Sequence, residues 1–321
     1  MKAWRVHSNG EPRDVMRLEE IPPPEPGPGQ LLVKVLAANI NYPDALLCRG
    51  EYQVRPPLPF TPGVEVCGEI ADGPRAGERV LGQPVLPVGG FGELAVITEE
   101  TALPAPASLD DAEAAALHIG YQTGWFGLHR RARLQPGETL LVHAAAGGVG
   151  SAAVQLGKAA GARVIGVVGG TAKAEVAREL GCDLVIDRRA DDLVAEVKKA
   201  TEGRGADVVY DPVGGDAYAK SVKCVAFEGR ILVVGFASGA VPTPGLNHAL
   251  VKNYSILGLH WGLYAQREPA SIPACHQELT ALADAGAIRP LVSERVPLDS
   301  TADAVQRVFD GVTTGRLVIT P

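Results

Sequence analysis

The sequence predicts an α/β protein in which a doubly wound parallel sheet follows a β-rich region. Two observations carry this prediction. A glycine-rich turn stands between an apolar run and a helix of small residues, and short apolar runs alternate with helical patterns from residue 110 to about residue 260. The chain before about residue 112 has a different texture, because it is rich in Pro and Gly and its apolar runs are short.

The N-terminal region is predicted to consist of short strands, since turn-forming residues bound each of its apolar runs. These runs are Ala3–Val6, Leu31–Ala38, Val64–Ile70, Arg79–Leu81 and Glu93–Ile97. The proline-rich tract Pro22–Gly29 can form neither a helix nor a central strand. We therefore expect it to be a stiff connection between two strands.

The alternating region begins with a helix over Ala112–Leu117, which the segment Ser108–Asp110 can cap. Six apolar runs separated by helical patterns then predict six parallel strands. They are Thr139–Val142, Arg163–Val168, Leu184–Ile186, Val208–Tyr210, Ile231–Val234 and Ser255–Leu259. The tail adds helices at about Cys275–Ala285 and Thr301–Asp310 and a last strand at Arg316–Ile319.

The glycine-rich turn is the most informative feature of the chain. The run Thr139–Val142 leads into Gly147–Gly150, a helix of small residues covers Ser151–Ala160, and a second apolar run follows. Strand, turn, helix and strand form the βαβ unit that binds a dinucleotide, with the phosphates at the helix N-terminus. Ala145 stands where the first glycine is usual, so a tight turn without a ligand is the alternative. The candidate cofactor-binding residues of this turn are Ala146, Gly147, Gly148 and Val149.

The end of the second strand predicts which dinucleotide is bound. Sites selective for NAD usually place Asp or Glu there, whereas this chain has Gly169 and Gly170, followed by Lys173. A carboxylate about 4 Å from a 2′-phosphate would cost roughly 1–4 kcal/mol. If the third apolar run is the neighbouring strand, Arg188 lies near the same pocket. The pattern favours NADP(H), and the alternative is that both cations are ordinary surface residues.

The end of the fifth strand supplies three further candidates for cofactor binding. Gly235, Phe236 and Ala237 follow the run Ile231–Val234, and open α/β sheets bind ligands outside the carboxyl ends of their strands. Phe236 is expected to cover the cofactor, and an aromatic side chain in the core is the alternative.

Composition excludes several classes of function. A net charge of −7, with no long run of basic residues, disfavours nucleic acid as a partner. The chain has no apolar stretch long enough to span a membrane, and its first residues lack the apolar core of a signal peptide. Its five cysteines are scattered, which favours a reducing compartment over a disulfide framework. We therefore expect a cytoplasmic protein.

Motifs spread over the whole length resemble one family. They are NYPD at residues 41–44, RGEY at 49–52, LPFTPGVE at 58–65, YQT at 121–123, AAAGGVG at 144–150, YDPVGG at 210–215 and VGFASG at 234–239. In these motifs the chain resembles the zinc-free quinone oxidoreductase, or zeta-crystallin-like, branch of the medium-chain dehydrogenase/reductase superfamily.

The resemblance implies a β-rich, GroES-like catalytic domain that is split in sequence, with a Rossmann domain inserted into it. The expected domains are residues 1–115 plus 262–321 for the first and residues 116–261 for the second. The active site would lie in the cleft between them, and Thr123 would lie near the nicotinamide.

Zinc is not expected. The resemblance indicates that zinc-dependent relatives have Cys at the position of Asn41 and His at the position of Val64. A catalytic zinc ion needs three protein ligands from Cys, His and carboxylate, and the remaining Asp44 and Glu65 alone make a poor site.

Without a metal, the reduced nicotinamide carries the hydride, while the protein binds, orients and desolvates the reactants. This chemistry suits acceptors conjugated to a carbonyl, such as quinones and enones. We expect Asn41 to donate a hydrogen bond to the cofactor or to the acceptor oxygen, or else to hold a loop. Tyr52 is expected to donate a hydrogen bond or a proton to the reduced oxygen, or else to be a packed aromatic. Asp44 is expected to orient its neighbours.

The leading hypothesis is an NADPH-dependent quinone or enone reductase. One alternative is a 2-enoyl reductase acting on an acyl-CoA or a similar thioester, and another is an NADPH-binding protein with a structural role and little turnover. The apolar run Ser255–Leu259 is expected at the sheet edge, where an unpaired strand invites pairing with a second chain. A homodimer joined through this edge is therefore predicted.

Overall fold

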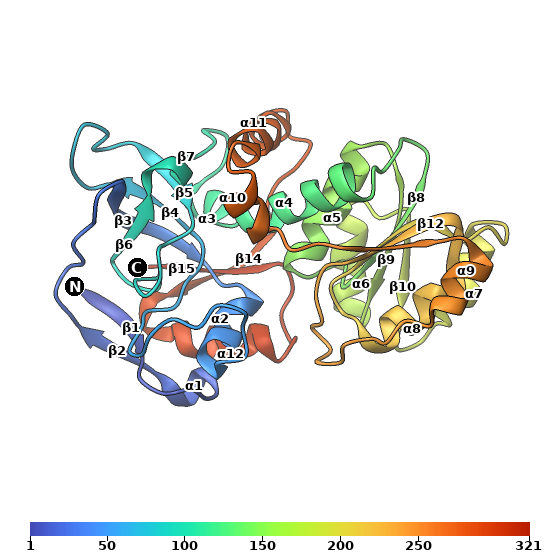
Figure 1. Ribbon diagram of the computed structural model, residues 1–321, viewed down its shortest axis with the longest axis horizontal. Coiled ribbons are helices and arrows are strands. Elements are labelled where there is room, and N and C mark those ends of the chain that lie inside the picture. The colour runs from blue at the N-terminus through green and yellow to red at the C-terminus, as the bar shows by residue number, and fades with distance from the viewer. The chain divides into compact units, whose positions relative to one another are not determined.

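The computed structural model describes residues 1–321, and the chain forms two compact units (Figure 1). Unit 1 comprises Met1–Ile119 and Arg289–Pro321, and unit 2 comprises Gly120–Ile288. Both ends of the chain belong to unit 1, so the β-rich part is split in sequence as the resemblance implies. The division differs from the expected boundary at residue 262, because residues 262–288 belong to unit 2.

Residues 262–288 contain two helices, α10 (Gly262–Arg267) and α11 (Ser271–Asp284), which are anchored on unit 2. Their partners lie in α4 (His118–Trp125) and in the π-helical turn η2 (Phe126–Arg131). The anchoring contacts are the stacking of Tyr264 on Phe126 at 4.2 Å between ring centroids, the ion pair of Glu268 with Arg130, and the hydrogen bond from Trp125 to Glu278. A helical pattern in the sequence does not reveal which unit the helix joins.

Unit 1 is built on a seven-stranded sheet in the order β14-β15-β3-β4-β5-β7, with β6 paired to β3. Its strands are β3 (Gln30–Asn39), β4 (Val66–Ile70), β5 (Arg79–Gly82), β6 (Leu94–Thr98), β7 (Leu103–Pro104), β14 (Val292–Pro297) and β15 (Arg316–Thr320). The C-terminal strand β15 pairs antiparallel with β3 and aligns Val318 with Asn39. This pairing closes the split unit.

The rest of unit 1 consists of a small sheet and short helices. Strands β1 (Lys2–Val6) and β2 (Met16–Glu20) pair antiparallel, and the proline-rich tract between β2 and β3 is irregular, which confirms the predicted connection. The helical segments are α1 (Pro12–Val15), α2 (Tyr42–Arg49), η1 (Glu99–Thr101), α3 (Asp111–Ala115), η3 (Leu298–Ser300) and α12 (Thr301–Phe309). The predicted cap of α3 is present, because Asp110 accepts a hydrogen bond from the Glu113 amide.

Two strands of unit 1, β2 and β14, lack the apolar run that predicts a strand from sequence. Strand β2 reads MRLEE in a two-stranded sheet, and β14 reads VSERVP at the edge of the larger sheet. Most of their side chains face solvent. Their conformation therefore follows from pairing with a neighbouring strand rather than from their own hydrophobic pattern.

Unit 2 is built on a six-stranded parallel sheet in the order β10-β9-β8-β11-β12-β13. Its strands are β8 (Thr139–His143), β9 (Arg163–Val168), β10 (Leu184–Asp187), β11 (Ala206–Asp211), β12 (Val225–Val233) and β13 (Ser255–Gly258). The helices between them are α5 (Gly148–Ala159), α6 (Thr171–Glu179), α7 (Leu193–Ala200), α8 (Gly215–Cys224) and α9 (Leu246–Lys252). The predicted Rossmann sheet is confirmed, and β13 is its edge strand. The strand order reverses between β8 and β11, where open sheets bind ligands.

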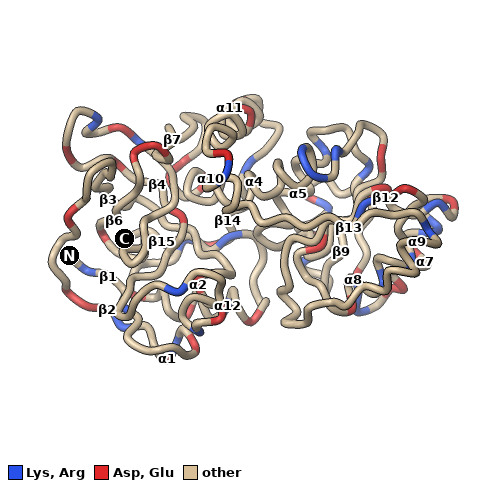
Figure 2. Tube along the Cα trace, in the orientation of Figure 1, with Lys and Arg blue, Asp and Glu red and all other residues tan.

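Charge is distributed along both units. Figure 2 shows Lys, Arg, Asp and Glu interspersed along the trace of each unit. No helix in the structure combines the length and the hydrophobicity that a bilayer-spanning segment needs.

The turn from β8 into α5 depends on one glycine. Ala144 adopts a left-handed conformation with φ of 50°, which folds the chain back over the end of β8. A Cβ atom on Gly150 would lie 2.7 Å from the Ala144 carbonyl carbon and closer still to its oxygen. Only glycine lets the first turn of α5 approach this backbone, so Gly150 sets the position of the helix N-terminus.

Gly150→Ala should therefore destabilise unit 2. The added methyl group meets backbone atoms, which cannot rotate away as a side chain can, and overpacking of this kind costs about 1–3 kcal/mol. Urea denaturation followed by circular dichroism measures the loss. Gly262→Ala is the matched control, because its Cβ would first meet the flexible His260 side chain at an ordinary 3.4 Å. Equal stability of the two variants would contradict the packing argument.

Candidate functional site

Asn41 belongs to a buried polar cluster in unit 1. It is the N-cap residue of α2, and its side-chain amide donates to Glu65 Oε2 over 2.9 Å. Its side-chain oxygen, Oδ1, accepts from Arg316 Nη1 over 2.8 Å. All three side chains are at least nine-tenths buried. The side-chain amide of Asn41 is thus held between the Glu65 carboxylate and the Arg316 guanidinium. This arrangement favours the alternative in which Asn41 holds a loop, because its amide group is already engaged within the chain.

Glu65 is the centre of this cluster. Its carboxylate also accepts from Asn39 Nδ2 over 2.7 Å and from the backbone amide of Ile119, in α4, over 2.6 Å. Burial raises the pKa of Glu65, while the charge of Arg316 and these donors oppose the rise. The Glu65 carboxylate thus has several hydrogen-bond donors and a cation nearby, so its removal would leave the buried amides of Asn39 and Asn41 without this acceptor.

Asp44 ties α2 to the segment before β4. One carboxylate oxygen accepts from the Asn41 amide over 2.7 Å. The other accepts from the Gly63 and Val64 amides over 3.0 and 3.1 Å. Asp44 has no exposed surface, and burial raises its pKa to about 7. The side chain therefore orients neighbouring backbone.

Tyr52 and Thr123 occupy different surroundings. Tyr52 packs against the hydrophobic core of unit 1, and burial, together with the nearby Asp44 charge, raises the pKa of its phenol. Its hydroxyl group has no hydrogen-bond partner within the chain. Thr123 lies in α4, belongs to unit 2 and is 8% exposed. The predicted residues Asn41, Asp44 and Tyr52 thus come from unit 1, and all the others come from unit 2.

The glycine-rich turn of unit 2 has the geometry of a phosphate-binding turn. It follows β8 at the point where the strand order reverses, and Gly147 is the N-cap residue of α5. The first amides of α5 have no acceptor within the helix and carry its positive dipole end. Ala145, at the position of the usual first glycine, is fully buried and donates its backbone amide to Val167. This alanine is therefore compatible with the turn.

Three cations gather at the end of β9. A Cβ atom on Gly169 would lie 3.3 Å from Arg188 Nε, and one on Gly170 would lie 3.2 Å from Arg189 Nη1. The charges of Arg189 and Arg188 also act on Lys173, whose pKa is lowered first by burial and then by these two neighbours. Like charges are held close together here, which is the electrostatic character of an anion-binding site.

One carboxylate lies beside these cations. Asp187 ends β10 and accepts from the amides of Gly170 and Arg189 over 2.9 and 3.0 Å. These two hydrogen bonds, followed by the charges of Arg189 and Arg188, lower its pKa. Its Oδ1 atom is occupied by these two backbone donors, and the charges of Arg188 and Arg189 both act on the carboxylate.

The loop after β12 lies beside the loop after β11. Asp211 accepts from the Val213 and Gly214 amides, and its carbonyl oxygen accepts from the Gly235 amide. Phe236 is 39% exposed and lies against Gly214, where an added Cβ would be 2.9 Å from its ring. The alternative of a core aromatic is therefore wrong, and the ring is available to a ligand. Ala237 is held by its backbone hydrogen bond to Pro212.

The structure brings together no group of three or more His, Cys, Asp or Glu side chains that could hold a metal ion.

Sequence patterns miss the roles of three residues in the charged clusters: Glu65, Arg316 and Arg189. Arg189 has a detectable signal, because it is the second half of an Arg-Arg pair after the third strand. Arg316 has none, since it begins an ordinary-looking strand 275 positions from its partner Asn41.

Two family models match the chain, one in each unit. The model described as an alcohol dehydrogenase GroES-like domain matches residues 27–107, and the model described as a zinc-binding dehydrogenase matches residues 148–277. A quinone oxidoreductase-like protein 2 homolog from Nematostella vectensis is 38% identical over 300 residues, which cover 91% of this chain and 82% of that protein.

Solved structures show the same similarity. The Escherichia coli quinone oxidoreductase complexed with NADPH has a TM-score of 0.92 and 30% identity, with all of both chains covered. The quinone oxidoreductase from Thermus thermophilus, described with its NADPH complex, has a TM-score of 0.87 and 30% identity, again over all of both chains.

The buried Asp44 should make stability depend on pH. Its pKa of about 7 in the folded protein exceeds its ordinary value of 3.8, so the native state binds this proton more tightly than the unfolded chain does. The resulting stability is fully present below about pH 4 and is lost as the pH rises through about 7. Relative to Asp44→Asn, the wild-type protein should lose up to about 1.4 kcal/mol per pH unit in this window. Urea denaturation at a series of pH values measures the difference, and a constant difference would disprove the assignment.

Proposed function

The chain belongs to the quinone oxidoreductase branch of the medium-chain dehydrogenase/reductase superfamily, and on this premise we propose that it transfers a hydride from NADPH to a quinone or another conjugated carbonyl acceptor. The observation that carries the choice of cofactor is the group of cations formed by Lys173, Arg188 and Arg189 beside Gly169 and Gly170. The observation that supports the reaction is the similarity to quinone oxidoreductases over the full length of the chain.

Unit 2 has the residues to bind the cofactor. The N-terminus of α5, with Ala146, Gly147, Gly148 and Val149, would hold the pyrophosphate, because its amides and dipole favour a negative charge. The 2′-phosphate would be held by the three cations, since each can donate a charge-assisted hydrogen bond. Gly235, Phe236 and Ala237 would line the site at the end of β12, with the exposed Phe236 ring against the cofactor.

The acceptor chemistry is assigned to a few side chains. NADPH supplies the hydride when bound, and the protein stabilises the charge that develops on the acceptor oxygen. Tyr52 is the proposed donor to that oxygen, because its hydroxyl group has no partner within the chain and burial keeps its phenol protonated. Thr123 is proposed to contact the nicotinamide. Asn41 and Asp44 would position the backbone around the acceptor, and no metal ion takes part.

A panel of acceptors tests the proposed reaction. NADPH oxidation should be fast with 1,4-benzoquinone and 9,10-phenanthrenequinone and should survive treatment with a chelator. Faster turnover of crotonyl-CoA would replace the proposal with the enoyl reductase, and no turnover of any acceptor would leave a binding role.

Tyr52→Phe should lower kcat for the accepted quinone by about 100-fold, which is the low end of the usual contribution of one proton donor. Unchanged kinetics in this variant would leave Tyr52 as a packing residue.

NADPH should bind more tightly than NADH. Lys173→Ala removes one charge-assisted hydrogen bond, so it should weaken NADPH binding by about 1–3 kcal/mol and leave NADH binding nearly unchanged. Arg189→Ala should have the same selective effect. Intrinsic fluorescence titration measures both cofactors, and Lys158→Ala is the control, because that lysine is paired with Asp183 instead. Equal affinities of the wild-type protein for both cofactors would reject the choice of NADP(H).

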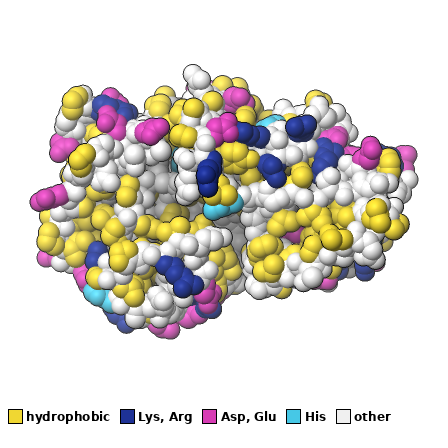
Figure 3. Space-filling view, viewed as in Figure 1, with side chains coloured by type: hydrophobic (Ala, Val, Ile, Leu, Met, Phe, Trp, Pro, Cys, Tyr) yellow, Lys and Arg dark blue, Asp and Glu magenta, His cyan; other side chains and the backbone are white.

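We further propose a cytoplasmic homodimer joined at the free edge of β13. Four apolar side chains in the segment that leads into this strand are 70–79% exposed, namely Val241, Leu246, Leu250 and Val251. Figure 3 shows hydrophobic side chains gathered on the part of unit 2 where the loop after β12 runs in Figure 1. An apolar area beside an unpaired edge strand is the usual mark of a protein interface.

Light scattering tests the dimer. Leu257→Asp should give a monomer, because it places a charge in the proposed interface. It is a sharper test than Ile256→Asp, since Ile256 also packs on the core of unit 2. Val312→Asp, at an exposed apolar position of unit 1, should leave the mass unchanged. A monomeric wild-type protein at micromolar concentration would disprove the proposal.

A further inference from the structure

Unit 2 has a second group of cations, which line a pocket at the amino ends of the parallel strands. The glycine-rich turn lies at the carboxyl ends of the same strands. The pocket has a volume of about 290 Å³. It lies where β11 and β12 begin, whereas the glycine-rich turn follows the end of β8. Its walls come from α7, the turn before β11, the end of α8, the start of β12 and the end of α9. The lining residues are Lys198, Gly203, Arg204, Gly205, Lys223, Cys224, Val225, Phe227 and Lys252.

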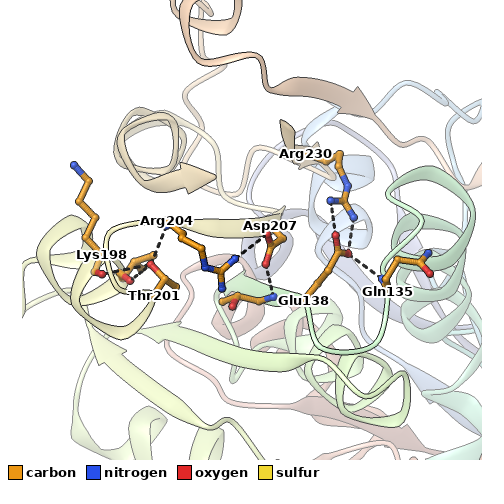
Figure 4. A network of polar contacts seen from close by, with 10 residues as sticks. Gln135, Glu138, Lys198, Thr201, Arg204, Asp207 and Arg230 are labelled. Carbon is orange, nitrogen blue, oxygen red and sulfur yellow. Dashed lines mark hydrogen bonds and ion pairs between the residues drawn. The ribbon is translucent and has the colours of Figure 1, made fainter. Parts of the chain in front are cut away.

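The lining contains four cations and no acid. Lys198 and Lys223 have no ion-pair partner, and Lys252 donates only to the Val222 carbonyl oxygen over 2.9 Å. Arg204 lies 3.7 Å from Asp207, whose other oxygen accepts from the Thr139 amide. In Figure 4 the Arg204 guanidinium faces Asp207, while the Lys198 ammonium group points away from this network. In a chain with a net charge of −7, three lysines without a carboxylate partner form a local positive potential.

The positions of the three lysines can also be explained without a ligand. Lys198, Lys223 and Lys252 lie in the last turns of α7, α8 and α9, where a cation interacts favourably with the helix dipole. The dipoles do not account for the convergence of three helix ends on one hollow. Burial lowers the pKa of Lys252, and the charge of Lys198 lowers it further, so these two like charges act on each other within the pocket.

One side of the pocket is apolar. Val225 and Cys224 are buried in its wall, and the Phe227 ring is 71% exposed beside the cations. The turn before β11 is held in place, because the buried Thr201 hydroxyl donates to the Val197 carbonyl oxygen and accepts from the Gly205 amide. A hollow that is lined by cations and by an exposed aromatic residue suits an anion that carries a flat ring.

We propose that this pocket binds a small aromatic phosphate, a monophosphate ester with one flat ring. The phosphate contacts Lys198, Lys223 and Lys252, and the ring stacks on Phe227. The volume lies at the small end of the range for ligand sites, so it admits a molecule of this size rather than a whole dinucleotide. The pocket lies away from the glycine-rich turn, so its occupancy does not depend on the proposed reaction.

Isothermal titration calorimetry with phenyl phosphate tests the site. The protein is first saturated with NADPH, which occupies the other anion-binding position, and the buffer has low ionic strength because salt screens such contacts. We expect saturable binding of phenyl phosphate that is tighter than the binding of inorganic phosphate or of phenol. The Lys198→Gln/Lys223→Gln double variant should bind it at least about tenfold more weakly, as the loss of charge-assisted hydrogen bonds predicts.

Two further variants isolate the parts of the site. Lys199→Gln is the matched control, because Lys199 neighbours Lys198 on α7 and lies 3.9 Å from Glu196 but does not line the pocket. It should bind phenyl phosphate like the wild-type protein. Phe227→Ala should bind phenyl phosphate no more tightly than inorganic phosphate. An absence of saturable binding would overturn the proposal, and so would a loss of affinity in Lys199→Gln equal to that in the double variant. Inorganic phosphate that binds as tightly as phenyl phosphate would also overturn it, because the lysines would then act only as charges at helix ends.

Discussion

Unit 2 is organised around the close approach of α5 to the end of β8. Gly150 permits this approach, and the left-handed Ala144 turns the chain into it. The N-terminus of α5 consequently lies at the point where the strand order reverses, with its free amides directed beyond the sheet. The cations after β9 and β10 and the Phe236 loop after β12 follow strands of the same sheet and end at the same edge. Strand direction therefore assembles the candidate cofactor site.

Unit 1 depends on contacts between distant parts of the chain. The pairing of β15 with β3 brings Arg316 to Asn41, and Glu65 then joins Asn41, Asn39 and the start of α4 through hydrogen bonds. A buried carboxylate and a buried guanidinium are each costly without polar partners, and both of these side chains form a hydrogen bond to Asn41. Their effect here is to orient the Asn41 amide and the loop around it. The pairing of β15 with β3 thus joins the two parts of the unit, and the polar contacts fix the orientation of Asn41.

Cations gather at both ends of the strands of the unit 2 sheet. At the carboxyl ends of the strands, Lys173, Arg188 and Arg189 lie around Gly169 and Gly170. At the amino ends, lysines from three helix ends converge on a hollow beside Phe227. Each group combines like charges that a bound anion would stabilise, although the chain as a whole is acidic.

Patterns in the sequence were sufficient to predict the parallel sheet, the glycine-rich turn and the absence of an acid after the second strand, because each is a local arrangement of residue types. They placed Arg188 near the same pocket only on the condition that the third apolar run was the neighbouring strand, and the pairing of β10 with β9 meets this condition. The folded chain was needed to learn that Asn41 is held by Glu65 and Arg316, that Phe236 is exposed, and that α10 and α11 join unit 2. These features rest on contacts between residues far apart in the chain, which no local pattern records.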